Sequence, residues 1–102
     1  MAKNRRRLPP VHPGEILGED LIRPLGLSIN RLARELSVPV TRMSEIVNGR
    51  RSITADTALR LARYFGSSPR FWMNLQAAYD LDVVTRASAE RIERDVHPHE
   101  AA

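Results

Sequence analysis

The chain has 102 residues, of which 42% are hydrophobic and 27% are charged, which predicts one soluble globular domain with a modest core. The absence of cysteine excludes disulfides, iron–sulfur clusters and thiolate zinc sites, and it is typical of the reducing cytoplasm, where we expect the protein. Leu8-Pro9-Pro10 follows the basic start, and no apolar run approaches about 18 residues, so we expect neither a cleaved signal peptide nor a membrane span.

Positive charge is concentrated in the first half of the chain. Residues 1–51 hold ten Lys and Arg against five Asp and Glu, a net charge of +5, whereas residues 52–102 hold six against seven, a net charge of −1. A basic half favours a polyanionic partner, although the same excess also serves solubility alone.

The chain begins with a basic arm and a first helix. Residues 1–12 hold several cations and two adjacent prolines but few apolar side chains, so we expect an extended or disordered segment. Pro13 suits the first turn of a helix, and Glu15, Glu19 and Asp20 place acid near the positive end of its dipole. These signals predict a first helix over about residues 13–24.

A second and a third helix follow, joined by a tight turn. Ser28 is a typical N-cap, and the apolar residues of Ile29–Leu36 recur at i, i+3, i+4 and i+7, the spacing of one buried face. Pro39 ends this helix and suits the start of the next one. That third helix is predicted over Val40–Val47, before Gly49 supplies a left-handed stop.

The second half of the chain is also helical. Thr54 suits the N-cap of a fourth helix that ends at Gly66, and Ser68-Pro69 begins a fifth helix, which we expect to be mainly core through Trp72 and its neighbours. Residues 81–96 hold sparser apolar side chains, so a helix there needs a neighbour to bury them. No alternating pattern predicts a strand.

The third helix carries the strongest functional signal. A helix that reads DNA needs polar side chains on its outer face and a preceding helix that holds its inner face. Thr41, Glu45 and Asn48 share the outer face at i, i+4 and i+7, with Arg42 beside them. Arg forks onto guanine, Thr offers a hydroxyl or a methyl, and Glu accepts from cytosine N4. An ordinary solvated helix surface is the alternative interpretation.

Further cations lie after this helix and in the arm. Asn48-Gly49-Arg50-Arg51-Ser52 places two cations where backbone phosphates would meet them, which favours the DNA interpretation. Lys3–Arg7 either adds attraction to phosphate or the minor groove, or is a solubilising tail.

The chain offers little for catalysis or metal binding. We interpret His97-Pro98-His99 as a solvated tail that lacks further fixed ligands, and His12 also lies outside the predicted core. Asp80 and Asp82 lie at a predicted helix junction, where capping or solvation is the simpler role. We expect no enzyme, cofactor or metal site; the enzymatic alternative is a small nuclease or hydrolase that uses these carboxylates and the tail histidines.

Four motifs together resemble a known family. They are His12-Pro13-Gly14-Glu15, the segment 44–49 (SEIVNG), the segment 54–62 (TADTALRLA) and the segment 71–76 (FWMNLQ). The middle of the chain resembles the Cro/phage-repressor helix-turn-helix, and residues 11–83 as a whole resemble the HigA-type antitoxins, also called the VapI or plasmid-maintenance antidote family.

The resemblance implies an all-α fold, a five-helix Cro/phage-repressor-like helix-turn-helix domain with a C-terminal helical extension. We accordingly divide the chain into a basic arm (1–12), a DNA-binding domain (13–80) and a C-terminal extension and tail (81–102). The resemblance also implies an antitoxin that represses its own operon as a dimer and neutralises a HigB-like messenger-RNA endonuclease toxin. A free-standing regulator without a toxin, and an interaction protein without DNA affinity, are the alternatives among binding proteins.

The resemblance also assigns roles to single residues. The base-reading positions of the repressor family fall on Val40, Thr41, Arg42 and Glu45. Its phosphate-contacting positions fall on Asn48, Arg50 and Arg51, and we add Ser28 and Asn30 at the start of the second helix. Val40 departs from the polar residue common in that family and suits a thymine methyl instead.

The segment 71–76 leaves its own roles partly open. Trp72 fits the core face of the fifth helix. Asn74 and Gln76 fit either a solvated surface or an interface with a second subunit or the toxin, and the toxin-binding surface stays unknown.

Overall fold

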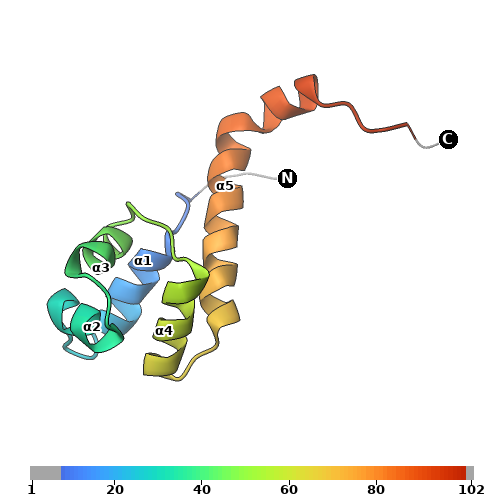
Figure 1. The fold of residues 1–102 in the computed structure, drawn as a ribbon. Coiled ribbons are helices and arrows are strands. Elements are labelled where there is room, and N and C mark those ends of the chain that lie inside the picture. Colours follow the sequence, from blue (N-terminus) through green and yellow to red (C-terminus); the bar gives the residue numbers. More distant parts are fainter. Residues whose placement is uncertain (1–7, 101–102) are drawn as a thin grey trace.

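The computed structural model describes residues 8–100 and shows five α-helices and no strand in that range. Four short helices form a compact body, and the first half of a long fifth helix packs against it (Figure 1). The helices are α1 (Pro13–Ile16), α2 (Ile29–Leu36), α3 (Val40–Val47), α4 (Ala55–Phe65) and α5 (Pro69–Asp95), and a π-helix, η1 (Leu17–Ile22), continues α1. Across these residues no helix combines the length and apolar character that a membrane crossing requires. The all-α, five-helix prediction is confirmed.

Side chains cap the start of three helices, at the predicted caps Ser28 and Thr54 and also at Ser68, where the sequence predicted the start of the fifth helix. The side-chain oxygens of Ser28, Thr54 and Ser68 accept hydrogen bonds from backbone N–H groups in the first turns of α2, α4 and α5. Gly49 and Gly66 adopt the left-handed φ values of 77° and 75° that stop α3 and α4. Local sequence chemistry therefore sets these boundaries, and α2 and α3 have the predicted bounds.

Two helix predictions are wrong. The first helix does not run as one α-helix over residues 13–24, because its second part, Leu17–Ile22, widens into a π-helix that ends at Ile22. The fifth helix continues through residues 80 and 81 to Asp95 without a junction. No Gly or Pro interrupts this stretch, so nothing in its backbone chemistry stops the helix.

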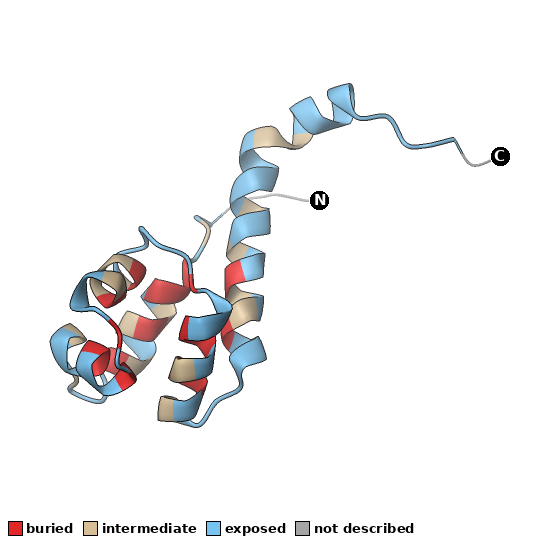
Figure 2. Cartoon of the chain, in the orientation of Figure 1, coloured by how far each residue is buried: buried red, intermediate tan, exposed pale blue. Residues whose placement is uncertain are grey.

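The core lies between the four short helices and the first turns of α5 (Figure 2). It is formed mainly by aliphatic side chains and Trp72, which is fully buried and donates its indole N–H to Ser67 Oγ at 3.1 Å. The structural role predicted for Trp72 is confirmed. The expectation that α5 is mainly core is wrong, because only Trp72 and Gln76 of its residues are buried, and Phe71 is 44% exposed.

The α1 helix lies very close to the end of α3. A Cβ atom on Gly14 would stand 1.7 Å from the carbonyl oxygen of Ile46, a distance that no side chain can occupy. The approach involves backbone atoms on both sides, so rotation of a side chain cannot relieve it. Gly14 therefore allows α1 to support the last turn of α3.

We predict that Gly14→Ala destabilises the fold by about 1–3 kcal/mol or more, because the methyl group forces two backbone segments apart. Gly18→Ala is the matched control, since its Cβ would meet only the Val47 Cγ1 atom, at 3.4 Å, and alanine favours a helix by about 0.5–1 kcal/mol. Urea unfolding followed by circular dichroism measures both variants. Equal stability of the two variants would contradict the proposed role of Gly14.

Candidate DNA interface

The α3 helix is supported from behind by α2 and α1. Leu32, Ala33 and Leu36 of α2 are buried, and so are Met43 and Ile46 of α3. The small side chain of Ala33 has no exposed surface, and its carbonyl accepts a hydrogen bond from Val38 N at 3.0 Å in the turn between the two helices. This packing holds α3 in place and leaves its opposite face toward solvent.

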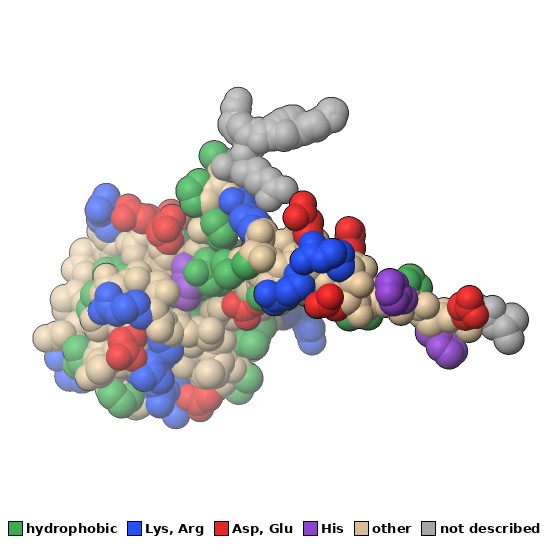
Figure 3. Space-filling view, turned by 90° about the horizontal axis from the view of Figure 1, so that it is seen from above, with side chains coloured by type: hydrophobic (Ala, Val, Ile, Leu, Met, Phe, Trp, Pro, Cys, Tyr) green, Lys and Arg blue, Asp and Glu red, His purple; other side chains and the backbone are tan. Residues whose placement is uncertain are grey.

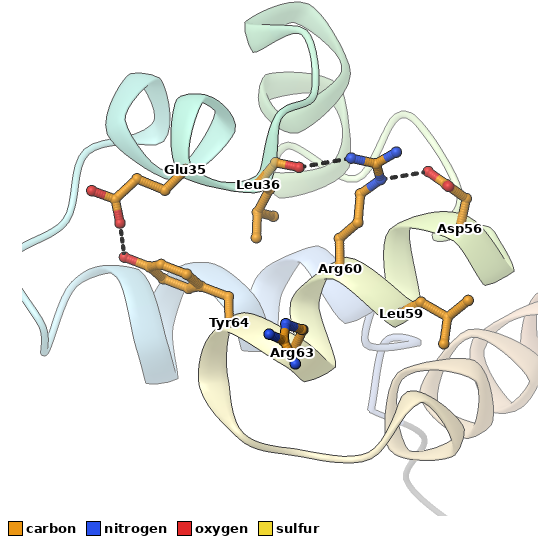
Figure 4. Close-up of a pocket in the computed structure, with 7 residues that line it drawn as sticks. All are labelled: Glu35, Leu36, Asp56, Leu59, Arg60, Arg63 and Tyr64. Atoms are coloured by element: carbon orange, nitrogen blue, oxygen red, sulfur yellow. Dashed lines mark hydrogen bonds and ion pairs between the residues drawn. The ribbon is translucent and has the colours of Figure 1, made fainter.

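The end of α2 is closed by a side chain from α4. Ser37 adopts a left-handed φ of 58°, which turns the chain toward Pro39. Arg60 Nη1 donates to the carbonyl oxygen of Leu36 at 2.9 Å (Figure 4). It also donates to the carbonyl oxygen of Ser37 at 3.3 Å. A cation at this position satisfies C-terminal carbonyls of α2 and suits the negative end of its dipole.

The candidate base-reading residues differ in exposure. Val40 is 44% exposed and Thr41 is exposed, so both present their side chains to solvent at the start of α3. Arg42 and Glu45 are half-buried because each forms an ion pair within the protein. Arg42 Nη1 lies 3.5 Å from Asp56 Oδ2. None of the four belongs to the buried face of α3, which is formed by Met43 and Ile46.

Glu45 pairs with a residue of the following loop. Its Oε1 accepts a hydrogen bond from Arg51 Nε at 2.7 Å, and the Glu45 backbone carbonyl accepts one from Arg50 N at 2.8 Å. These contacts fold the loop back against α3. A candidate base acceptor and a candidate phosphate contact therefore neutralise one another in the free chain.

The remaining candidate phosphate contacts lie on the surface, after the end of α3 and at the start of α2. Asn48 Nδ2 donates to the Ser44 carbonyl at 2.8 Å, and Arg50 is exposed without an ion pair to any residue in 8–100. At the start of α2, Ser28 Oγ accepts from Arg31 N at 3.0 Å, which leaves its hydroxyl proton available, and Asn30 is exposed. The cations Lys3–Arg7 lie outside the described residues.

Two buried polar residues hold the loop after α3, and the sequence did not indicate either role. Gln76 of α5 is buried, and its Oε1 accepts a hydrogen bond from Ile53 N at 2.7 Å, while its Nε2 donates to Asp80 Oδ1 at 3.0 Å. Both roles proposed for Gln76 from the sequence are therefore wrong, whereas Asn74 is exposed. A glutamine on a half-apolar helix face was the available signal, but its partner is 23 residues away.

His12 is the second of these residues. It is buried, contrary to the expectation that it lies outside the core. Its Nδ1 accepts a hydrogen bond from Gly14 N at 2.9 Å and so caps α1, and its ring lies edge-on to Tyr79 at 4.8 Å. The ring also lies beside the loop after α3, because a Cβ atom added to Gly49 would stand 3.8 Å from the Cγ atom of His12. One side chain thus joins α1, the loop and α5.

Asp80 and Asp82 of α5 are engaged in local pairs. Asp80 accepts from Gln76, and Asp82 pairs with Arg86 at 2.8 Å, both inside a continuous helix instead of at a junction. Within residues 8–100 no three His, Asp or Glu side chains come together as metal ligands would. Basic and acidic side chains intermix along the projecting half of α5 (Figure 3).

Comparisons with known proteins place this geometry in a family. A family model described as Helix-turn-helix matches residues 19–72, which include α2, α3 and α4. The chain belongs to the helix-turn-helix family. Virulence-associated protein I of Dichelobacter nodosus is 53% identical to it over 77 residues, which cover 76% of this chain and 71% of the relative.

Solved structures extend the likeness beyond the helix-turn-helix unit. A HigA-family antidote protein from Coxiella burnetii is 51% identical, with a TM-score of 0.84 over 90% of this chain and 100% of its own. The Pseudomonas aeruginosa antitoxin HigA, solved with the higBA promoter, is 42% identical, with a TM-score of 0.85 over 89% and 99%. The resemblance of this helix-turn-helix chain to HigA-type antitoxins is confirmed.

Protonation of His12 is expected to weaken the fold. Burial lowers the pKa of His12 below its ordinary value of 6.5, against the opposing effects of the Arg51 backbone and of Asp80 and Glu15. Its stabilising contribution is therefore complete above pH 6.5 and is lost as the pH falls through the lower folded-state pKa, because a protonated Nδ1 cannot accept from Gly14.

We predict that the free energy of unfolding of the wild type decreases between pH 7.5 and 5.5 and that His12→Asn, which keeps a capping side chain, flattens this dependence. His97→Asn in the exposed tail is the control and keeps the wild-type profile. Urea titrations at each pH provide the measurement. A His12→Asn profile parallel to that of the wild type would exclude His12 as the titrating group.

Proposed function

We propose that this chain is a HigA-type antitoxin and transcriptional repressor, which binds operator DNA in the cytoplasm as a homodimer and neutralises a messenger-RNA endonuclease toxin. The observation that carries the proposal is the outward face of α3, followed by Arg50 and Arg51, on a framework similar to a HigA protein solved with promoter DNA. Val40, Thr41, Arg42 and Glu45 are the proposed base contacts.

The proposed base contacts and the proposed phosphate contacts would have different roles on DNA. The start of α3 enters the major groove, where Thr41 reaches base edges and Val40 lies against a thymine methyl. The proposed phosphate contacts surround this helix and set its register on the duplex, and they are Ser28, Asn30, Asn48, Arg50 and Arg51. For Arg51 to reach a phosphate and Glu45 a base, DNA must replace their mutual ion pair.

The α5 helix supplies the proposed dimer contact. Leu81, Val84 and Ile92 are exposed and fall on one face at i, i+3 and i+11, with small Ser88 between them. Their half of α5 extends beyond the body of the molecule, so a second copy can cover the stripe without touching α3 (Figure 1). Two α3 helices then read half-sites about 10 base pairs apart, or a multiple of that spacing.

Inhibition of a toxin rests on the likeness to HigA antitoxins, and a free-standing repressor without a toxin is the alternative. Both share every proposed DNA contact. Purification of the tagged chain expressed from its native operon separates them, because an antitoxin retains the small protein encoded beside it. Absence of any bound partner favours the free-standing repressor.

We predict that Arg50→Ala/Arg51→Ala weakens DNA binding, because two cations no longer neutralise backbone phosphates. The probe is the duplex that the wild type enriches from a random-sequence library. The slope of log K against log salt should become shallower by about 0.9 for each phosphate that is no longer neutralised, while base preference is kept. Arg91→Ala/Arg94→Ala, with the same charge change at the end of α5, keeps the wild-type slope. An unchanged slope in the loop variant would show that the loop faces away from DNA.

We predict that Leu81→Lys/Val84→Lys converts the dimer to a monomer, because two charges would be buried at the contact. Val83→Lys/Ala87→Lys changes exposed residues of the same helix outside the stripe and serves as the matched control. Sedimentation equilibrium at micromolar concentration measures the mass of each. A stripe variant that stays dimeric would place the dimer contact elsewhere.

A further inference from the structure

Asp56 lies where three helices of the candidate DNA interface meet. It occupies the first turn of α4, two residues after the N-cap Thr54. Its Oδ2 atom is 2.9 Å from Arg60 Nε and 3.5 Å from Arg42 Nη1. Arg60 in turn reaches the Leu36 carbonyl at the end of α2 (Figure 4). One carboxylate thus connects a candidate base-reading side chain with the residue that closes α2.

The contact directs the side chain of Arg42. Only 33% of that side chain is exposed, compared with 50% for Arg51 in the neighbouring loop, because it extends toward α4. A single nitrogen, Nη1, meets Asp56. The other N–H groups of the guanidinium stay available, and a fork onto guanine needs two of them in a fixed plane.

Stability does not account for this contact. Asp56 and Arg42 form a solvent-accessible pair with a long separation, and such pairs contribute little to folding. Arg60 already provides Asp56 with a closer partner. The hydrogen bond from Arg60, together with the charges of Arg60 and Arg42, holds the pKa of Asp56 below its usual value, so its carboxylate stays ionised at neutral pH.

We propose that Asp56 is a positioning residue that sets the base preference of Arg42. It orients the guanidinium before DNA arrives, which reduces the rotational freedom that a flexible arginine loses when it forks onto a base. Its negative charge also repels phosphate, so Asp56 lowers affinity for DNA of any sequence while it increases the preference for one base pair. The inference rests on the proposed DNA-binding function.

The test compares base preference in the wild type, Arg42→Ala and Asp56→Asn. Each protein first selects duplexes from a random-sequence library, and binding is then measured on the wild-type motif with each of the four base pairs at the position that Arg42→Ala affects. Asp56→Asn is expected to lose at least about twofold in discrimination at that same base pair. Its affinity for an unrelated duplex is expected to stay equal or rise, which a merely misfolded variant could not show.

Two further variants isolate the Asp56–Arg42 contact. Glu35→Gln is the matched control, because Glu35 of α2 is likewise a carboxylate that joins two helices, through Tyr64 of α4 at 2.5 Å, and that pairs with an arginine, Arg31 of its own helix, at 3.0 Å. Its selected motif should equal that of the wild type. Arg60→Ala removes the closure of α2 and is expected to lower affinity for all sequences while base preference survives.

Each outcome decides the inference. Loss of the same preference in Asp56→Asn and Arg42→Ala, with preference kept in the two further variants, supports it. Full wild-type preference in Asp56→Asn overturns it, as does unchanged preference in Arg42→Ala or loss of the same preference in Arg60→Ala. A wild type that enriches no motif contradicts the proposed function itself, and the inference falls with it.

Discussion

The position of α3 depends on a contact between two backbones. Gly14 of α1 lies against the Ile46 carbonyl, closer than any residue with a Cβ atom allows. The start of α1 is capped by His12, whose ring also reaches the loop after α3 and Tyr79 of α5. The short motif His12-Pro13-Gly14 therefore joins the framework to the proposed DNA-reading unit. A framework that holds α3 rigidly suits a function in which a few side chains must meet base edges in a fixed register.

Two ion pairs hold charged side chains of the proposed DNA-contacting surface in the free chain. Glu45 holds Arg51, and Asp56 holds Arg42, although the first half of the chain carries a net charge of +5. The Glu45–Arg51 pair is solvent-accessible, so it can be exchanged for contacts to DNA at a small cost in stability. The Asp56 contact uses only Nη1 of Arg42 and leaves its other N–H groups available. The main effect of the two ion pairs is to restrict where two long arginine side chains point. The acidic side chains of this surface thus orient the arginines, while the arginines attract phosphate.

The long helix α5 packs against the four short helices with its first turns and is exposed along its second half. Its first turns contribute Trp72 to the core and Gln76 to the loop that follows α3. Its second half leaves the body and presents apolar side chains to solvent. Because the helix is continuous, a partner bound to the second half and DNA bound near the loop would act on one rigid element. This arrangement connects the proposed dimer contact mechanically with the proposed DNA contact.

The sequence by itself determined the elements whose signals are local. Ser28, Thr54 and Ser68 cap their helices, Gly49 and Gly66 stop theirs, and the apolar spacing of Ile29–Leu36 marks the buried face of α2. Each of these depends on hydrogen bonds or side chains within one or two helical turns, so residue type and spacing suffice to predict it. The outer face of α3 follows from the same periodicity.

The tertiary structure alone decided which distant residues meet. Burial of His12 and Gln76, the approach of Gly14 to Ile46 and the pairing of Arg42 with Asp56 all join segments that are separated along the chain. The spacing of apolar residues shows which face of a helix is buried. The partner of a polar side chain, or the backbone that a glycine contacts, depends on how the helices pack. The π-helix of η1 likewise reflects the backbone as packed, beyond what local capping signals express.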